Sequence, residues 1–367
     1  MPTGSVASTS AAMSSLYRSF DGKEAKDFLS HEVIAVAKDN DPDVISALFT
    51  LACDGNDKGS VVANFLFSLY TDKRHENSAL ACQLGRDSLK LVEIVSARNK
   101  EKPPEDQWRI PTKLLVMAGF EANNGSQLHS DIVAEIKTQE PRLILYLEED
   151  TSLFGTNRMV TGAELNVISS ELTANTQVQY RDAVGISDAD VFAQNVADNL
   201  VASLTHADAK HGESSPSMIV IPLLLKDHWV LFGMLKNAAG EKSAVVFSSV
   251  QYFEDKHGMQ NEYGKYLDAL AQACSNDLQS ITVLDANLQN HAPNACGIFV
   301  VGAIEKMADS QADKAVAALE SYVDAFVGSD SAEMALFNIQ GRARLFGAVL
   351  DRCRAEESAE QSSRGRG

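Results

Sequence analysis

Three short apolar runs between residues 217 and 249 constrain the fold of this chain more than any other feature. They read SMIVIPLLL (217–225), HWVLFGML (228–235) and SAVVFSS (243–249), and they are rich in Ile, Val, Leu and Phe. Runs of this length and composition are typical of buried strands. The sequence Asn237-Ala-Ala-Gly240, between the last two runs, is typical of a hairpin turn. The pattern therefore predicts neighbouring strands of one sheet.

The residues on both sides of these runs predict a mixed α and β domain from 140 to 354. Thr161 and Glu164 have the spacing of a capping box, in which the two residues satisfy backbone N–H groups at a helix start. The other predicted elements are strands at 142–148 and 280–286, and helices near 161–172, 188–205, 259–275, 296–307, 311–327 and 331–353. The polar segment 355–367 is expected to be a disordered tail.

The part of the chain before Pro141 has a helical period instead. Apolar residues recur three and four positions apart from 24 to 138, for example at Val44, Leu48 and Leu51. This pattern predicts an all-helical domain. It is expected to be an interaction domain that resembles VHS domains, and the sequence leaves its partner open. Residues 1–22 are rich in Ser, Thr and Ala and lack the basic start and apolar stretch of a cleavable signal peptide, so they are expected to be a disordered tail.

Charge and cysteine content exclude several classes of function. The 367 residues include 32 Lys and Arg against 50 Asp and Glu, a net charge of −18, which argues against nucleic acid and anionic membrane surfaces as partners. No apolar run reaches the roughly 18 residues that a membrane helix needs, so no integral membrane segment is expected. The five cysteines are odd in number and form no CxxC pair. That pattern argues against a disulfide framework and a structural zinc site, and it favours a reducing compartment.

One cysteine stands where nucleophilic chemistry is favoured. Cys296 begins a predicted helix, where free backbone N–H groups and the positive end of the helix dipole stabilise a thiolate. A nearby imidazolium, which His228 could supply, would lower the thiol pKa further. Attack on a carbonyl creates an oxyanion, to which the Gln289 side chain and the backbone N–H of Cys296 could donate. Gly297 has no side chain, so a substrate backbone can come close to it.

The order of these residues resembles the Ulp/SENP-type cysteine proteases of clan CE. That family has His-Trp on a strand, a third member at the end of the next strand, then Gln, and then Cys-Gly at a helix start. Here these are His228-Trp229, the strand VVFSS, Gln289 and Cys296-Gly297. The resemblance covers about 150–330, and the helical domain before it makes the chain most similar to bacterial effector deubiquitinases of the SseL/ElaD type. It implies an α+β fold, in which an Ulp-like, papain-related protease domain with a mixed sheet flanked by helices follows the all-helical domain.

The resemblance also implies a role for each motif residue. Cys296 is the expected nucleophile that forms a thioester, and His228 is the expected base that later protonates the leaving lysine amine. Gln289 is expected to donate to the oxyanion. Trp229 is expected to wall a narrow channel that admits an extended Gly-Gly tail, and Gly297 is expected to contact the same substrate.

The implied substrates are conjugates of ubiquitin or of a ubiquitin-like protein on lysine side chains. The implied chemistry needs no metal and no organic cofactor. The resemblance further implies a secreted bacterial effector that acts in the host cytoplasm.

The first departure from the family pattern concerns the third catalytic member. Where the family has Asp or Asn before a serine, this chain has Ser248. A hydroxyl can accept a hydrogen bond from His228 but brings no negative charge, so it stabilises an imidazolium less than a carboxylate does. Glu254 or Asp255 could replace Ser248 if their loop folds back.

The second departure concerns the oxyanion donor. Gln289 lies seven residues before Cys296, one more than is usual in the family, and Asn290 occupies the usual offset. The longer amide of Gln289 favours it, and Asn290 is the alternative.

Two other functions compete with isopeptide hydrolysis. An acetyltransferase of the YopJ kind uses the same catalytic order, but it needs basic pockets for coenzyme A and inositol phosphate, which a net charge of −18 disfavours. A non-catalytic adaptor with a decayed site is the other alternative, and Ser248 is the feature that supports it.

Overall fold

The computed structural model describes residues 42–53, 57–71, 78–103, 106–146, 153–186, 188, 191, 217–250, 264–273 and 278–364. Two compact units divide the chain. One takes in the residues up to Ile144 with Thr151–Gly155 and Ile339–Gly347, and the other takes in Leu145–Asp150, Thr156–Asn338 and Ala348–Gly367. Several predictions fall outside the described residues: the tail at 1–22, most of the helix near 188–205, and the alternatives Glu254 and Asp255.

The first unit is helical, as its periodic apolar residues predicted. Its helices are α4 (Pro42–Ala52), α5 (Asp57–Tyr70), α6 (Ser78–Asn99), α7 (Thr112–Glu121) and α8 (Gln127–Gln139). Their apolar stripes are fully buried at Leu48, Leu66, Leu84, Leu114 and Ile136. In water, short helices draw most of their stability from this packing and little from intrinsic propensity.

Two short segments from further along the chain complete this unit. Phe154 packs its ring against Phe120, His129 and Phe346, with ring centroids 5.1, 5.8 and 6.0 Å apart. These contacts draw 151–155 and 339–347 into the helical unit. The boundary expected between 138 and 140 therefore leaves out two segments that share its core.

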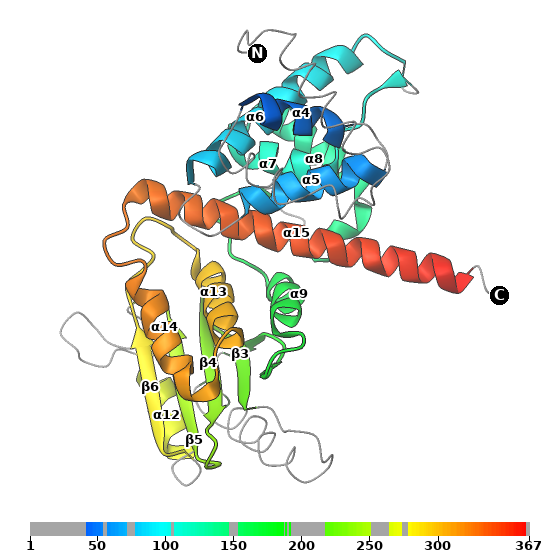
Figure 1. The fold of residues 1–367 in the computed structure, drawn as a ribbon. Coiled ribbons are helices and arrows are strands. Elements are labelled where there is room, and N and C mark those ends of the chain that lie inside the picture. The colour runs from blue at the N-terminus through cyan, green and yellow to red at the C-terminus, as the bar shows by residue number, and fades with distance from the viewer. Residues whose placement is uncertain are drawn as a thin grey trace. The chain divides into compact units, whose positions relative to one another are not determined.

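The second unit is built on one mixed sheet (Figure 1). The strand order is β1-β3-β4-β5-β6, and β2 also pairs with β3. Neighbours from β3 to β5 are antiparallel, while β1, β2 and β6 each pair in parallel. The elements are α9 (Gly162–Thr173), β1 (Val178–Tyr180), β2 (Val184–Ile186), β3 (Met218–Leu225), β4 (His228–Lys236), β5 (Lys242–Ser248), α12 (Gly264–Ala273), β6 (Ser280–Asp285), α13 (Cys296–Ala308), η5 (Ala312–Lys314), α14 (Ala315–Asp324) and α15 (Ser331–Arg364). The stretch Ile339–Gly347 of α15 belongs to the first unit.

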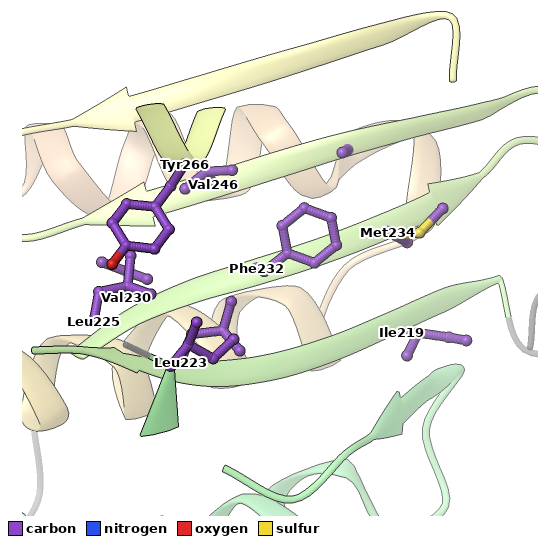
Figure 2. Close-up of a cluster of buried hydrophobic side chains, with 10 residues drawn as sticks. Ile219, Leu223, Leu225, Val230, Phe232, Met234, Val246 and Tyr266 are labelled. Carbon is purple, nitrogen blue, oxygen red and sulfur yellow. The ribbon is translucent and has the colours of Figure 1, made fainter. Parts of the chain in front are cut away.

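The two faces of this sheet are covered by different helices. On β4, Val230, Phe232 and Met234 alternate into an apolar cluster that Tyr266 of α12 completes (Figure 2). The intervening residues face α13, because a Cβ added to Gly233 would lie 2.9 Å from Met307. Helices therefore flank the sheet on both faces, and the expected fold class, an α+β domain with a mixed sheet after a helical region, is confirmed.

One predicted strand is wrong. The segment 142–148 was expected to be extended, but Pro141–Leu145 forms a 3-10 helix directly after α8. Pro141 has no backbone N–H for a ladder, and the N–H of Leu143 donates back to the carbonyl of Glu140, 3.2 Å away. An apolar run of this length does not by itself separate a strand from a buried turn of helix.

The expected tail at 355–367 is also corrected, because α15 continues as far as Arg364. The segment contains Glu, Ala and Gln, which are good helix formers, and Gly first appears at 365. Arg352 pairs with Glu356 one turn later at 2.7 Å, and the hydroxyls of Ser358 and Ser362 donate to carbonyls four residues back. Local interactions thus continue the helix through a polar sequence.

Within the described residues, no helix is long and apolar enough to cross a membrane. The same residues contain no cluster of three or more His, Cys, Asp or Glu side chains placed to hold a metal ion.

Candidate active site

The topology brings three chain segments to one end of the sheet. Strand β4 begins at His228, and β5, which is antiparallel to it, ends at Ser248. Strand β6 is parallel to β5 and ends at Asp285, which pairs with Ser248. The chain then runs from 286 to 295 and enters α13 at Cys296. His228 and Cys296, which are 68 positions apart in the sequence, are thereby directed to the same end of the sheet.

His228 is held in a buried position. It is 6% exposed, and it pairs with Leu225 across a turn made of only two residues. The first of these, Lys226, has a φ of 59°. This left-handed conformation is uncommon for a residue other than Gly, Asn or Asp, and such strain is often found next to functional sites.

A hydrogen bond joins the imidazole of His228 to the hydroxyl of Ser248. The Nε2 atom of His228 lies 3.1 Å from Oγ of Ser248, and that hydroxyl donates to the carbonyl of Val250 at 2.7 Å. Because a serine hydroxyl has one hydrogen, Ser248 accepts from His228 when it donates to Val250. In this arrangement Nε2 carries the proton of the neutral ring, and Nδ1 carries the lone pair that a base needs.

Burial sets the acidity of His228. Removal from water lowers its pKa to about 4, and the negative charge of nearby Asp227 opposes this shift only in part. The imidazole is therefore neutral at neutral pH. Ser248 adds no charge that would reverse this, so the site differs from one in which a carboxylate stabilises an imidazolium.

Cys296 lies at the first turn of α13, as its sequence context predicted. It is 2% exposed, and no described side chain caps this helix start, which has Ala295 at the N-cap position. An uncapped first turn leaves backbone N–H groups and the positive end of the helix dipole close to the sulfur. Both favour the thiolate and supply donors for a developing oxyanion.

Gln289 is held by Ser249, the residue that follows Ser248, which contacts His228. Its Nε2 atom donates to Oγ of Ser249 at 2.7 Å, and the backbone N–H of Leu288 donates to the carbonyl of Ser249 at 2.8 Å. Asn290, the alternative donor, is exposed. An amide has two N–H hydrogens, so Gln289 can keep its contact with Ser249 and still donate once more.

Trp229 and Gly297 meet at a third residue. The indole Nε1 of Trp229 donates to the carbonyl of Val160 at 2.8 Å. A Cβ added to Gly297 would lie 2.7 Å from Cβ of Val160, so the helix start approaches Val160 at a distance that only glycine allows. The residue after His228 therefore contacts the backbone of Val160, and the residue after Cys296 contacts its side chain.

Sequence reasoning missed three residues that hold this site. Ser249 has a readable signal, because it stands next to Ser248 at the strand end. Val160 has none, since an apolar residue before a capping box is ordinary. Asn294 has a weak one, because Asn tolerates the left-handed backbone better than most residues and stands just before a predicted helix start. In the structure its φ is 57°, and its amide donates to the carbonyl of Asn157.

A model of the ElaD/SseL-like C-terminal family matches residues 151–344. Deubiquitinase SseL of Salmonella typhimurium is 24% identical over 341 residues, which cover 90% of this chain and 94% of that protein. A solved de-sumoylating protease is 16% identical with a TM-score of 0.34, covering 58% of this chain and 87% of that one. Xanthomonas campestris effector protein XopD, solved bound to ubiquitin, is 14% identical with a TM-score of 0.30, covering 48% and 85%.

The stretch matched by the family model is more than half of the 367 residues, and it contains every candidate site residue. The resemblance expected from the His228, Gln289 and Cys296 motifs is therefore confirmed at the level of the family: the chain belongs to the ElaD/SseL-like C-terminal family.

Proposed function

We propose that this protein is a cysteine-type deubiquitinase, which hydrolyses the isopeptide bond between ubiquitin, or a ubiquitin-like protein, and a lysine side chain. One observation carries the proposal: Nε2 of His228 lies 3.1 Å from Oγ of Ser248, at the same sheet end from which the chain enters α13 at Cys296. The name of the Salmonella relative, deubiquitinase SseL, supports the choice of substrate.

In the acylation step, Nδ1 of His228 takes the proton of the Cys296 thiol while the sulfur attacks the isopeptide carbonyl carbon. The oxyanion accepts hydrogen bonds from the backbone N–H of Cys296 and from Gln289. When the intermediate collapses, the C–N bond breaks and the proton on Nδ1 passes to the leaving lysine amine. A thioester now joins the terminal glycine of ubiquitin to Cys296.

In the deacylation step, water attacks the thioester carbon and gives one proton to Nδ1 of His228. The same donors stabilise the second oxyanion. The C–S bond then breaks, the free carboxyl group of ubiquitin leaves, and the proton returns to the sulfur of Cys296. Ser248 holds the imidazole in the tautomer that both steps require.

Substrate choice is proposed to depend on shape and on charge. Trp229 and Gly297 would border a narrow channel suited to a Gly-Gly tail without side chains. The chain carries a net charge of −18, which would speed the approach of the basic rim of ubiquitin. Because ubiquitin is a eukaryotic protein and SseL is bacterial, the proposed place of action is the host cytoplasm, reached by secretion.

Ubiquitin with a thiol-reactive group at its C-terminus tests this proposal directly. Wild-type protein is expected to gain the mass of one ubiquitin, and the Cys296→Ala variant to gain none. Cys353→Ala, which removes another buried thiol, is the matched control and should label like wild type. A SUMO probe run in parallel names the modifier. Folded wild-type protein that reacts with neither probe, but acetylates itself from acetyl-coenzyme A and releases coenzyme A, would support the acetyltransferase function instead. No reaction in either assay would point to an adaptor.

A carboxylate at position 248 should raise activity. Ser248→Asp places a negative charge beside Nε2 of His228, so it should raise the pKa of the imidazole from about 4 towards its ordinary value and stabilise the imidazolium formed in each step. We expect kcat/KM for a ubiquitin amide to rise about tenfold at pH 7.5, the amount that about 1.4 kcal/mol of transition-state stabilisation provides. The acid limb of the pH profile should move up from near pH 4.

Two further variants separate charge from hydrogen bonding at this position. Ser248→Asn offers a neutral acceptor, so its acid limb should stay near that of wild type. Ser248→Ala removes the acceptor and should lower kcat/KM about tenfold through loss of the fixed tautomer. If the acid limb has the same midpoint in the Asp and Asn variants, the charge at position 248 does not change the pKa of His228.

A further inference from the structure

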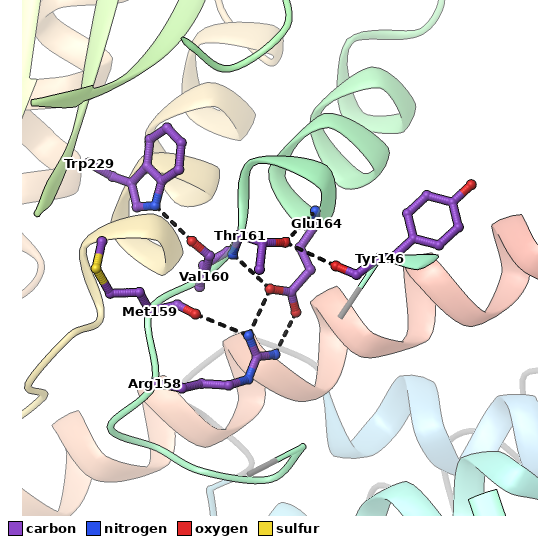
Figure 3. Close-up of polar contacts among 7 residues, drawn as sticks. All are labelled: Tyr146, Arg158, Met159, Val160, Thr161, Glu164 and Trp229. Carbon is purple, nitrogen blue, oxygen red and sulfur yellow. Dashed lines mark hydrogen bonds and ion pairs between the residues drawn. The ribbon is translucent and has the colours of Figure 1, made fainter. Parts of the chain in front are cut away.

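The segment Thr156–Glu164, here called the anchor segment, lies in the same unit as the active site and has no role in the chemistry proposed above. Its contacts reach from the active-site residues to the start of α9 (Figure 3). The inference drawn from it rests on the proposed function, because it concerns how the same site is kept in geometry.

The backbone carbonyls of the anchor segment are bound by side chains from around the site. The carbonyl of Asn157 accepts from Asn294, two residues before Cys296. The carbonyl of Val160 accepts from the indole of Trp229, the residue after His228. The segment thus contacts the chain beside the nucleophile and the chain beside the base.

The side chain of Val160 makes the second link to the nucleophile. It lies so close to the backbone of Gly297 that an added Cβ would be 2.7 Å from Cβ of Val160 and 3.0 Å from Cγ2. Val160 is itself buried, between Trp229 on one side and the start of α13 on the other. A shift of Val160 would therefore be transmitted to both His228 and Cys296, because closely packed interiors transmit strain.

A partly buried ion pair fixes the anchor segment. Both terminal guanidinium nitrogens of Arg158 contact the carboxylate of Glu164, at 2.5 and 2.8 Å, and the two side chains are 18% and 0% exposed. Glu164 also accepts from the backbone N–H of Thr161 at 2.8 Å, within the capping box of α9. Thr161 in turn donates to the carbonyl of Tyr146.

This arrangement differs from an ordinary helix cap. A capping box needs only the carboxylate and the Thr161 hydroxyl, and it works equally well with Gln in place of Glu. Arg158 is additional: a fork-like, two-bond contact that fixes direction as well as distance. Burial of such a pair seldom adds stability over apolar residues of the same size, so its contribution is better sought in geometry.

We propose that Arg158 and Glu164 are positioning residues, which hold Val160 between Trp229 and Gly297 and so set the distance between the base His228 and the nucleophile Cys296. Misplacement of reacting groups by about 1 Å can cost roughly a hundredfold in rate, so loss of the pair has room to act without unfolding the protein.

The variants Glu164→Gln and Arg158→Lys test this proposal in the full chain. Glu164→Gln keeps the capping box but removes the charge that binds Arg158. Arg158→Lys keeps the charge but removes the two-bond fork. The matched control is Arg352→Met, which breaks the exposed pair with Glu356, where the side chains are 58% and 31% exposed. Melting temperature and circular dichroism verify folding.

Two readouts separate positioning from a merely structural role. The first is the rate of Cys296 alkylation by iodoacetamide across pH 5–9, followed by mass spectrometry of its peptide. The second is kcat and KM for ubiquitin amide hydrolysis. Both variants are expected to lose about tenfold in kcat with KM nearly unchanged, and their alkylation profile should move towards that of an ordinary thiol, whose pKa is about 8.5. Arg352→Met should match wild type in both.

The alkylation measurement needs no ubiquitin, so it stands even if the proposed substrate is wrong. Unchanged alkylation profiles and kcat in folded variants would overturn the positioning role. If Glu164→Gln does not fold, Arg158→Lys decides alone, because it leaves every contact of the capping box intact.

Discussion

Replacing His228 with glutamine should lower kcat/KM for ubiquitin amide hydrolysis about a thousandfold at pH 7.5, within the range that a positioned acid–base group contributes. Glutamine is chosen because its amide can still donate to Oγ of Ser248, as Nε2 of His228 does at 3.1 Å. The buried hydroxyl then keeps its partner, and the loss reports the missing base.

The pH profile makes this prediction specific. Burial lowers the pKa of His228 to about 4, so the wild-type base stays deprotonated and competent from neutral pH down to about pH 5. Without the base, reaction depends on spontaneous ionisation of the Cys296 thiol. The rate of the His228→Gln variant should therefore rise nearly tenfold per pH unit over the range in which the Cys296 thiol remains mostly protonated.

His291 provides the matched control for this experiment. It is exposed, close in sequence to Gln289, and has no role in the proposed steps. His291→Gln should leave both kcat/KM and the pH profile as they are in wild type. A His228→Gln variant that folds and keeps activity within tenfold of wild type would contradict the assignment of the base.

The parts of the fold that sequence could predict are those set by local rules. Strands β3, β4 and β5 follow from short apolar runs between turns, and the helix start at Thr161 follows from its capping box. The start of α13 at Cys296 follows from apolar periodicity after a polar loop. The failures at 142–148 and after 355 have the same origin, since short apolar runs and polar runs both leave the choice of structure open.

The sequence was enough to name the candidate catalytic residues, but it could not predict the contacts that hold them in place. The order of His228, Ser248 and Cys296 is a one-dimensional signal, and the antiparallel pairing of β4 with β5 is enough to bring Ser248 to His228. The contact between Trp229 and Val160 joins residues 69 positions apart, and the contact between Asn294 and Asn157 joins residues 137 apart. Neither has a spacing rule, because both depend on how the segment before α9 packs against the sheet and α13.

Gln289→Ala should lower kcat by a hundredfold to a thousandfold and leave KM almost unchanged, because an oxyanion donor acts in the transition state and contributes little to substrate binding. The structure favours Gln289 for this role since Ser249 holds one of its N–H groups at 2.7 Å and so fixes the direction of the other. Steady-state kinetics on a ubiquitin amide measure both constants.

Three companion variants decide how the donor is held. Ser249→Ala frees the Gln289 amide without removing it, so it should lower kcat less than Gln289→Ala does. Asn290→Ala removes an exposed amide and should match wild type. The double variant Ser249→Ala with Gln289→Ala should be no slower than Gln289→Ala alone, because Ser249 acts only through Gln289. If kcat falls by a hundredfold or more in Asn290→Ala instead, Asn290 is the oxyanion donor. The contact between Gln289 and Ser249 then only stabilises the loop before α13.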